Sequence, residues 1–263
     1  MKTKMMTLLF TITLSLACTQ NSWAESKAFN PLDAHHSLYI PQGKGPFPAV
    51  LLLHASGGVQ KVFHQWAARL KKAGYVVYII DSFSPRGYKD RKSVGWDKAT
   101  AAQLADIAPA YQYLSTLPKV DTHRIGLLGF SMGGYSTLRA MQTSGEGTIP
   151  ALKALHFKAA ASFYGVCKWI SPHAKFKNTM KILIGDQDDR STTAACKTLV
   201  NSSPNVSIKI YPNAPHGFDN AELPQLEEVT DEKGEIYHVG YNKKSAQDAR
   251  YDLLEYFKEN LKK

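Results

Sequence analysis

The chain of 263 residues lacks several features that would point to other classes of protein. It has no internal repeat and no linker between two domains, and it contains neither an H-E-x-x-H motif nor a paired C-x-x-C motif of a metal site. Its longest apolar run, residues 5–17, is too short and too close to the start for a membrane-spanning helix. We therefore expect a single globular domain with no membrane span and no metal.

Acidic residues are fewer than basic ones, and the formal net charge is +10. The basic residues are scattered, often as pairs such as Lys71-Lys72 and Lys243-Lys244, and they form no patch interleaved with aromatic residues. Scattered lysines are typical of a solvated surface, whereas a nucleic-acid site gathers them into a patch or a known motif. The charge therefore predicts no nucleic-acid partner.

Residues 1–24 have the layout of a secretory signal peptide. Lys2 and Lys4 precede the apolar run, and Ser22-Trp23-Ala24 offers small residues at the positions that a signal peptidase reads. We expect cleavage after Ala24, which leaves residues 25–263 as one domain in the periplasm or outside the cell. In an alternative interpretation, Cys18 within Leu16-Ala17-Cys18 is a lipoprotein processing site and carries a lipid anchor.

Cysteine is scarce, with three in the whole chain. Cys18 lies in the signal segment, so Cys167 and Cys196 remain in the domain. An exported chain folds in an oxidising compartment, and both cysteines follow predicted strands. They form a disulfide if those strands are neighbours, and they are two separate buried thiols otherwise.

Strand and helix patterns alternate along the rest of the chain. The continuous apolar run at residues 49–53 is typical of a strand buried on both faces, residues 75–80 and 181–185 are further predicted strands, and amphipathic stretches such as 62–73 and 245–261 predict helices. This alternation predicts an α/β fold, a mostly parallel central sheet with helices on both faces. Residues 143–158 are polar and contain glycine, residues 219–242 are charged and show no clear period, and both segments are expected to be connections. Pro109 should kink the helix predicted over 97–114 or open a second one.

One corner carries the strongest chemical signal. Residues 124–140, RIGLLGFSMGGYSTLRA, predict a strand, a sharp turn and a helix, with Ser131 at the turn between Gly129 and Gly133. This G-x-S-x-G spacing is that of a nucleophile elbow, which exposes the serine hydroxyl and aims the next amide, that of Met132, at developing negative charge. The alternative is a serine that only caps the helix.

A glycine-rich loop, His54-Ala55-Ser56-Gly57-Gly58, follows the predicted strand at 49–53. Such a loop leaves backbone amides without partners, so Ala55 or Ser56 could supply the second donor of an oxyanion hole. The same glycines would also suit an ordinary turn between a strand and a helix.

A serine hydroxyl needs a base and an acid to become a nucleophile. Among nine histidines, His216 alone stands just past a predicted strand and before the last helix, in YPNAPHGF. Asp186, Asp188 and Asp189 follow the strand at 181–185, which gives the chain order serine, aspartate, histidine of α/β-hydrolases. We select Asp188 as the acid, with Asp189 and Asp186 as alternatives.

Arg86 lies in a polar loop after the strand predicted at 75–80. It could contact a substrate carboxylate at the end of the sheet. It could also pin its own loop to a neighbouring acid, which is the interpretation we favour.

The segments LLLHASGG, DSFSPRG, RIGLLGFSMGG, LIGDQDDRSTTAAC and YPNAPHGFD resemble the dienelactone hydrolase family of α/β-hydrolases, from about residue 47 to the C-terminus. The resemblance implies a hydrolase without a cofactor, with Ser131, Asp188 and His216 as nucleophile, acid and base. Founding members of the family use a cysteine nucleophile and a nearby glutamate, whereas this chain has Ser131 and His54-Ala55-Ser56 at those places.

These departures make dienelactone a poor candidate substrate. We therefore expect a serine esterase acting on a small-molecule ester. The alternatives are an amidase or peptidase of the same fold, and a catalytically silent binding protein.

Overall fold

A computed structural model describes residues 29–262 of the chain. The predicted signal peptide, its cleavage site after Ala24 and Cys18 lie outside these residues. No helix of the described part is both long enough and apolar enough to cross a membrane.

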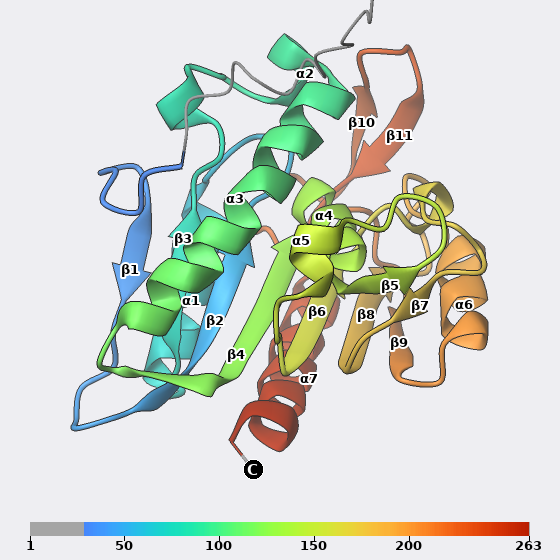
Figure 1. Ribbon diagram of the computed structural model, residues 1–263. Coiled ribbons are helices and arrows are strands. Elements are labelled where there is room, and N and C mark those ends of the chain that lie inside the picture. Colours follow the sequence, from blue (N-terminus) through green and yellow to red (C-terminus); the bar gives the residue numbers. More distant parts are fainter. Residues whose placement is uncertain (1–28, 263) are drawn as a thin grey trace, which may run out of the picture.

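A seven-stranded sheet forms the centre of the molecule (Figure 1). The strand order is β1-β3-β2-β4-β6-β8-β9, and every neighbouring pair is parallel except β1 with β3. This confirms the predicted fold class. The bounds are β1 (Ser37–Tyr39), β2 (Phe47–Leu53), β3 (Val76–Ile80), β4 (Val120–Phe130), β6 (Ala159–Phe163), β8 (Thr179–Gly185) and β9 (Val206–Tyr211).

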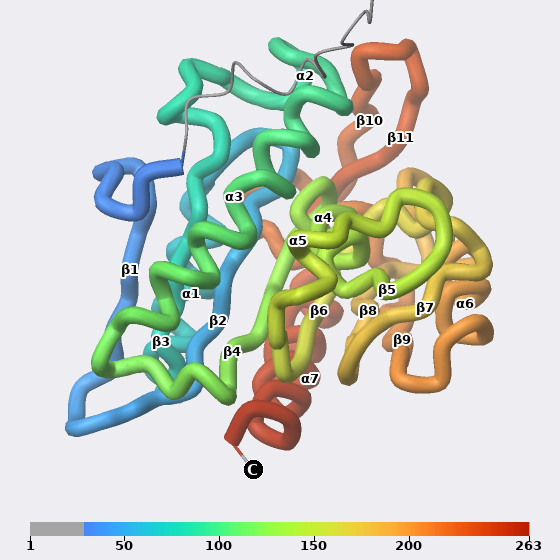
Figure 2. Tube along the Cα trace, in the orientation of Figure 1, coloured from blue at the N-terminus to red at the C-terminus, as the bar shows by residue number. Residues whose placement is uncertain are grey.

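Helices cover both faces of the sheet, as the apolar strands require (Figures 1 and 2). One face carries α3 (Trp96–Thr116) and α4 (Met132–Met141), and the opposite face carries α1 (Lys61–Lys72) and α7 (Lys243–Leu261). Pro109 lies inside α3, which is a single helix from end to end. The remaining helical segments are η1 (Ser84–Arg86), α2 (Arg91–Val94), α5 (Pro150–Lys153), η2 (Cys167–Trp169) and α6 (Thr193–Ser202).

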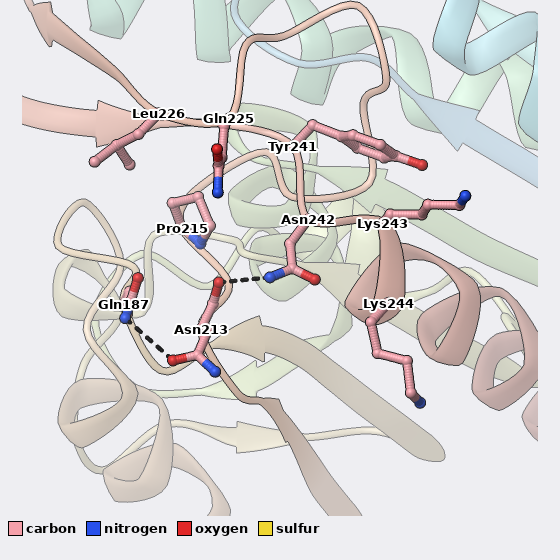
Figure 3. A pocket seen from close by; sticks show the side chains of 9 residues that line it. All are labelled: Gln187, Asn213, Pro215, Gln225, Leu226, Tyr241, Asn242, Lys243 and Lys244. Atoms are coloured by element: carbon pink, nitrogen blue, oxygen red, sulfur yellow. Dashed lines mark hydrogen bonds between the residues drawn. The ribbon is translucent and has the colours of Figure 1, made fainter.

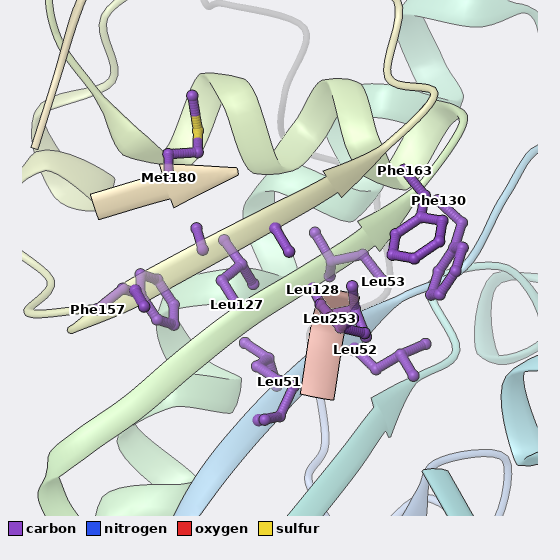
Figure 4. Close-up of a cluster of buried hydrophobic side chains, with 14 of the residues drawn as sticks. Leu51, Leu52, Leu53, Leu127, Leu128, Phe130, Phe157, Phe163, Met180 and Leu253 are labelled. Carbon is purple, nitrogen blue, oxygen red and sulfur yellow. The ribbon is translucent and has the colours of Figure 1, made fainter. Parts of the chain in front are cut away.

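The core lies between the sheet and these helices. Figure 4 shows leucines of β2 and β4 packed together with Phe130, Phe163 and, from α7, Leu253. Leu51, Leu52 and Leu53 are fully buried. Each such side chain contributes roughly 1.5–3 kcal/mol by leaving water, so the two central strands form a rigid base for the loops at their ends.

Two segments that were predicted as connections contain strands. Residues 143–158 hold most of β5 (Gln142–Ser144), which pairs with β7 (Lys175–Phe176), and the short helix α5. Residues 219–242 hold an antiparallel hairpin of β10 (Glu227–Thr230) and β11 (Ile236–Val239). Their patterns gave no signal because their strands are short and largely exposed, so neither a buried run nor a clear alternation develops.

Cys167 and Cys196 form a disulfide with an S–S distance of 2.06 Å. Cys167 follows β6 and Cys196 lies in α6, which follows β8, and β6 and β8 are neighbours in the sheet. The bond closes a loop over a sequence separation of 29 residues. Closing a loop of that size lowers the conformational entropy of the unfolded chain, which stabilises the folded state by about 3.5 kcal/mol at room temperature.

Replacing both cysteines, Cys167→Ala with Cys196→Ala, should lower the free energy of unfolding by about 2–4 kcal/mol, because the unfolded chain regains that freedom. Urea unfolding of the two proteins measures the difference, and alkylation without reductant followed by mass spectrometry serves as the control. Two thiols that react in the untreated protein would contradict the bond.

Candidate active site

The carboxyl ends of four parallel strands converge on one place. Ser131 follows β4, Asp188 lies three residues after β8, His216 lies in the loop after β9, and Ala55 lies in the loop after β2. In open parallel sheets this edge is where ligands bind, because the loops leaving the strands gather there. The sheet topology therefore brings together groups that are up to 161 residues apart in the sequence, from Ala55 to His216.

Ser131 occupies a strained corner between β4 and α4. Its φ of 51° and ψ of −111° lie outside the regions that side chains usually adopt. The corner is tight, since a Cβ on Gly129 would lie 2.0 Å from the Gly133 carbonyl oxygen, and one on Gly133 would lie 2.5 Å from that of Leu53. The Ser131 N–H donates to the Phe163 carbonyl at 2.9 Å, which ties the corner to the neighbouring strand.

A chain of hydrogen bonds runs inward from the Ser131 hydroxyl. Ser131 Oγ lies 2.7 Å from His216 Nε2, and His216 Nδ1 lies 2.9 Å from Asp188 Oδ2. The other Asp188 oxygen accepts from the Ser191 N–H at 2.7 Å, which orients the carboxylate. Because a carboxylate can only accept, Nδ1 carries the ring proton and the Nε2 lone pair faces Ser131. The arrangement can therefore take a proton from the hydroxyl.

The three aspartates considered as the acid have different surroundings. Asp188 is buried and contacts His216, whereas Asp186 is exposed. Asp189 turns the other way and contacts His238, with Oδ2 lying 2.7 Å from Nδ1. This hydrogen bond raises the pKa of His238. Only Asp188 is placed to orient His216.

Three backbone N–H groups near Ser131 have no hydrogen-bond partner among the described residues. The Met132 N–H begins α4, and within the described chain no acceptor takes it. In the same residues the N–H groups of Ala55 and Ser56 are also without an acceptor, while their carbonyls accept from Gly58 and Arg91. Free amides at a helix start and in the facing loop suit a developing oxyanion.

Hydrogen bonds from α3 and α4 fix the loop that carries Ala55. The His54 carbonyl accepts from Gln103 Nε2 at 3.0 Å, and Ser136 Oγ donates to Gln103 Oε1 at 2.7 Å. Burial lowers the pKa of His54, so its ring is neutral. It donates from Nδ1 to the Ala55 carbonyl at 2.7 Å and accepts at Nε2 from the Ser82 N–H at 3.2 Å.

The residues that fix the position of the His216 loop are not among those predicted from the sequence. Asp219, three residues after His216, is buried and accepts from Trp66 Nε1 at 2.6 Å and from the Tyr164 hydroxyl at 2.5 Å. Burial raises the pKa of Asp219, and burial together with Asp219 raises the pKa of Tyr164, which stays a phenol and donates. The Tyr164 ring also meets the His216 ring edge-on, at 4.8 Å between centroids. The one sequence feature that pointed to Asp219 is its place directly after the apolar Phe218, close to His216.

Arg86 is not at the site surface. Its guanidinium forms two parallel hydrogen bonds with the Asp106 carboxylate, at 2.8 Å and 2.7 Å, and both side chains are almost completely buried. A third bond reaches the Ser82 carbonyl at 3.0 Å. The pair therefore pins the loop after β3 to α3, and the burial of the guanidinium keeps it out of reach of a substrate carboxylate.

A cavity of about 140 Å³ opens beside Ser131 and His216. It is lined by the Ala55 loop, the start of α1, the His216 loop and the β10–β11 hairpin. A larger hollow of about 830 Å³ lies elsewhere, around Asn213, Pro215 and the start of α7 (Figure 3). Ser131 does not line that hollow, so we place the chemistry in the smaller cavity.

Comparisons with known proteins agree with this arrangement at the level of the fold. Among solved structures, a dienelactone hydrolase-like promiscuous phosphotriesterase from metagenomic libraries superposes with a TM-score of 0.67 at 16% identity, over 86% of this chain and 92% of that one. Identity this low supports the shared fold alone.

Sequence comparison reaches further. A "Putative carboxymethylenebutenolidase" from Synechocystis sp. is 25% identical over 247 residues, 84% of this chain and 90% of that protein. A "Probable 2-oxo-3-(5-oxofuran-2-ylidene)propanoate lactonase" from Bradyrhizobium sp. is 27% identical over 201 residues, 68% of this chain and 76% of that protein. The model of the dienelactone hydrolase family matches residues 35–261, nearly the whole described chain. This protein therefore belongs to the dienelactone hydrolase family and is a hydrolase with an α/β-hydrolase fold.

Proposed function

We propose that this protein is an exported serine hydrolase that cleaves carboxylic esters through an acyl-enzyme. The observation that carries the proposal is the hydrogen-bonded chain Ser131–His216–Asp188, with separations of 2.7 Å and 2.9 Å. Its three residues follow one another in the order serine, aspartate, histidine and sit beside a cavity and unpartnered amides. Nucleophile, base, orienting acid and charge-stabilising donors are the parts that acyl transfer requires.

In the first half of the reaction, Ser131 Oγ attacks the ester carbonyl while its proton passes to His216 Nε2. Asp188 accepts from Nδ1–H and stabilises the imidazolium that forms. The amide of Met132 and one amide of the Ala55-Ser56 loop donate to the tetrahedral oxyanion. His216 then gives the proton to the departing alcohol oxygen, which leaves an acyl group on Ser131.

In the second half, water replaces the alcohol. His216 Nε2 removes a proton from the water, the resulting hydroxide attacks the acyl carbon, and the proton returns to Ser131 Oγ as the acid departs. The related protein named as a lactonase supports this chemistry, because a lactone is a cyclic ester.

Replacing the nucleophile, Ser131→Ala, should lower kcat for phenyl acetate by about 10⁶-fold, since no other group can form the acyl-enzyme. The same change should abolish labelling by a fluorophosphonate probe. Ser144→Ala, on the exposed end of β5, is the matched control and should keep both activity and labelling.

Turnover that survives in Ser131→Ala would contradict the proposal. A wild-type protein that neither labels nor hydrolyses esters would favour a silent binding protein on this scaffold. Faster cleavage of acetanilide than of phenyl acetate would favour an amidase.

The role of the acid can be separated from its neighbours. Asp188→Asn should lower kcat by about 10⁴-fold, because an amide in place of the carboxylate favours the wrong His216 tautomer. Asp186→Asn removes the same charge from an exposed position and should leave kcat within twofold of wild type. Equal losses in both variants would argue for a general charge effect and against a specific role of Asp188.

Export is the remaining part of the proposal, and two features support it. The first 24 residues have a signal-peptide pattern, and a disulfide joins Cys167 to Cys196, a bond that persists in oxidising compartments. Expression of the full chain in a Gram-negative host should yield a periplasmic protein. Its intact mass, measured by mass spectrometry, should be that of a chain that begins at Glu25. Cys18→Ser should leave that mass unchanged, whereas a mature protein that begins with a lipid-modified Cys18 would contradict cleavage after Ala24.

A further inference from the structure

The β10–β11 hairpin is built into the wall of the candidate active site. Tyr237 and Val239, both on β11, line the cavity beside Ser131. The side chains of a strand alternate between its two faces, so these two share one face while Ile236 and His238 lie on the other. Ile236 is 60% exposed and His238 contacts Asp189, which agrees with that alternation.

The hairpin adjoins the residue that handles the leaving group. The rings of Tyr237 and His216 meet edge-on, with centroids 6.0 Å apart. Val239 pairs with His216 in an isolated β-bridge, and the next residue, Gly240, donates its N–H to the His216 carbonyl at 3.0 Å. In the proposed mechanism His216 protonates the departing alcohol oxygen. The departing alcohol is therefore on the His216 side of the cavity, where Tyr237 and Val239 form the wall.

Several ion pairs hold this wall in place. Arg190 Nη1 lies 2.8 Å from both Asp231 Oδ2 and Glu235 Oε2, at the tip of the hairpin. The Arg190 guanidinium also lies over two aromatic rings, 4.8 Å from the centroid of Tyr237 and 5.0 Å from that of Trp169. Arg91, likewise buried, pairs with Glu232. A wall whose tip is tied to the buried Arg190 and Arg91 cannot easily swing aside for a large group.

The space that this wall leaves is small. A cavity of about 150 Å³ accommodates a benzene ring, and the cavity here is about 140 Å³. We propose that the Tyr237–Val239 face of the hairpin determines specificity on the leaving-group side, and that it restricts substrates to esters whose alcohol part is no larger than about one six-membered ring. This inference rests on the proposed esterase function and adds the substrate class.

The test compares two series of esters on the wild-type protein. With the acyl group fixed as acetate, kcat/KM should be at least tenfold lower for 2-naphthyl acetate than for phenyl acetate, since a pocket discriminates by about 10- to 200-fold per misfit group. Tyr237→Ala should raise the ratio of kcat/KM for 2-naphthyl acetate to kcat/KM for phenyl acetate by about tenfold, and Val239→Ala should raise this naphthyl-to-phenyl ratio as well. Val239→Phe should lower it.

The controls separate the wall from the rest of the site. Ile236→Ala, on the opposite face of the same strand, should leave the ratio unchanged. With the alcohol fixed as phenol, the acetate-to-butanoate ratio should be the same in Tyr237→Ala as in the wild type, because the acyl side does not meet this residue. Fluorophosphonate labelling in every variant shows that Ser131 is intact, and circular dichroism shows that the fold is retained.

Equal naphthyl and phenyl rates in a labelled wild type would overturn the inference, as would a ratio that neither Tyr237→Ala nor Val239→Ala moves. A shift in the acyl series alone would place the hairpin on the other side of the substrate and would also overturn it. Failure of the proposed function looks different, since the wild-type protein would then neither label nor turn over any ester in either series.

Discussion

The close backbone contact between β4 and α4 is the constraint on which the site depends. Gly129 and Gly133 let the strand and the helix approach so closely that Ser131 must adopt a positive φ between them. A single added Cβ at either glycine would overlap a carbonyl oxygen, so the corner cannot form with other residues there. The buried leucines of β2 and β4 oppose relaxation of the strain, because moving the corner would mean moving the core. The exposed hydroxyl and the free Met132 amide are two consequences of the same turn.

The histidine loop needs a different kind of support, because it is a loop and not the end of a packed helix. Its position depends on Asp219, whose carboxylate accepts hydrogen bonds from the Trp66 N–H of α1 and from the hydroxyl of Tyr164, just after β6. A buried carboxylate is costly unless its oxygens are satisfied, and here each oxygen has a donor. The loop can therefore close over the sheet in one arrangement, with the His216 ring against Tyr164 and within reach of Ser131.

The sequence was informative where a local pattern determines the structure. Buried strands such as β2 and β3 are continuous apolar runs, and the turn at Ser131 is encoded by glycines two residues to either side, so both could be predicted. The spacing narrowed the acid to three aspartates, but only the fold separates Asp188 from Asp189, since neighbouring residues in this loop point to different partners. The sequence favoured an acid as the partner of Arg86 but did not identify Asp106, and the β10–β11 hairpin is held by partners distant in the sequence. No local period could reveal them.

The loop after β8 has two functions in three consecutive residues. Asp188 orients His216, while Asp189 and Arg190 contact the β10–β11 hairpin. The two hairpin contacts differ in strength. Asp189 and His238 are both about half exposed, so water screens the attraction between their side chains. Arg190 and Asp231 are buried, and removing one partner of a buried pair costs about 3–5 kcal/mol because the other charge is left without compensation.

The hairpin is therefore anchored chiefly through Arg190, two residues from the acid of the candidate site. A displacement of this loop would disturb the orientation of His216 and the position of Tyr237 together. The geometry of the proposed proton transfer and the shape of the pocket thus depend on the same short segment.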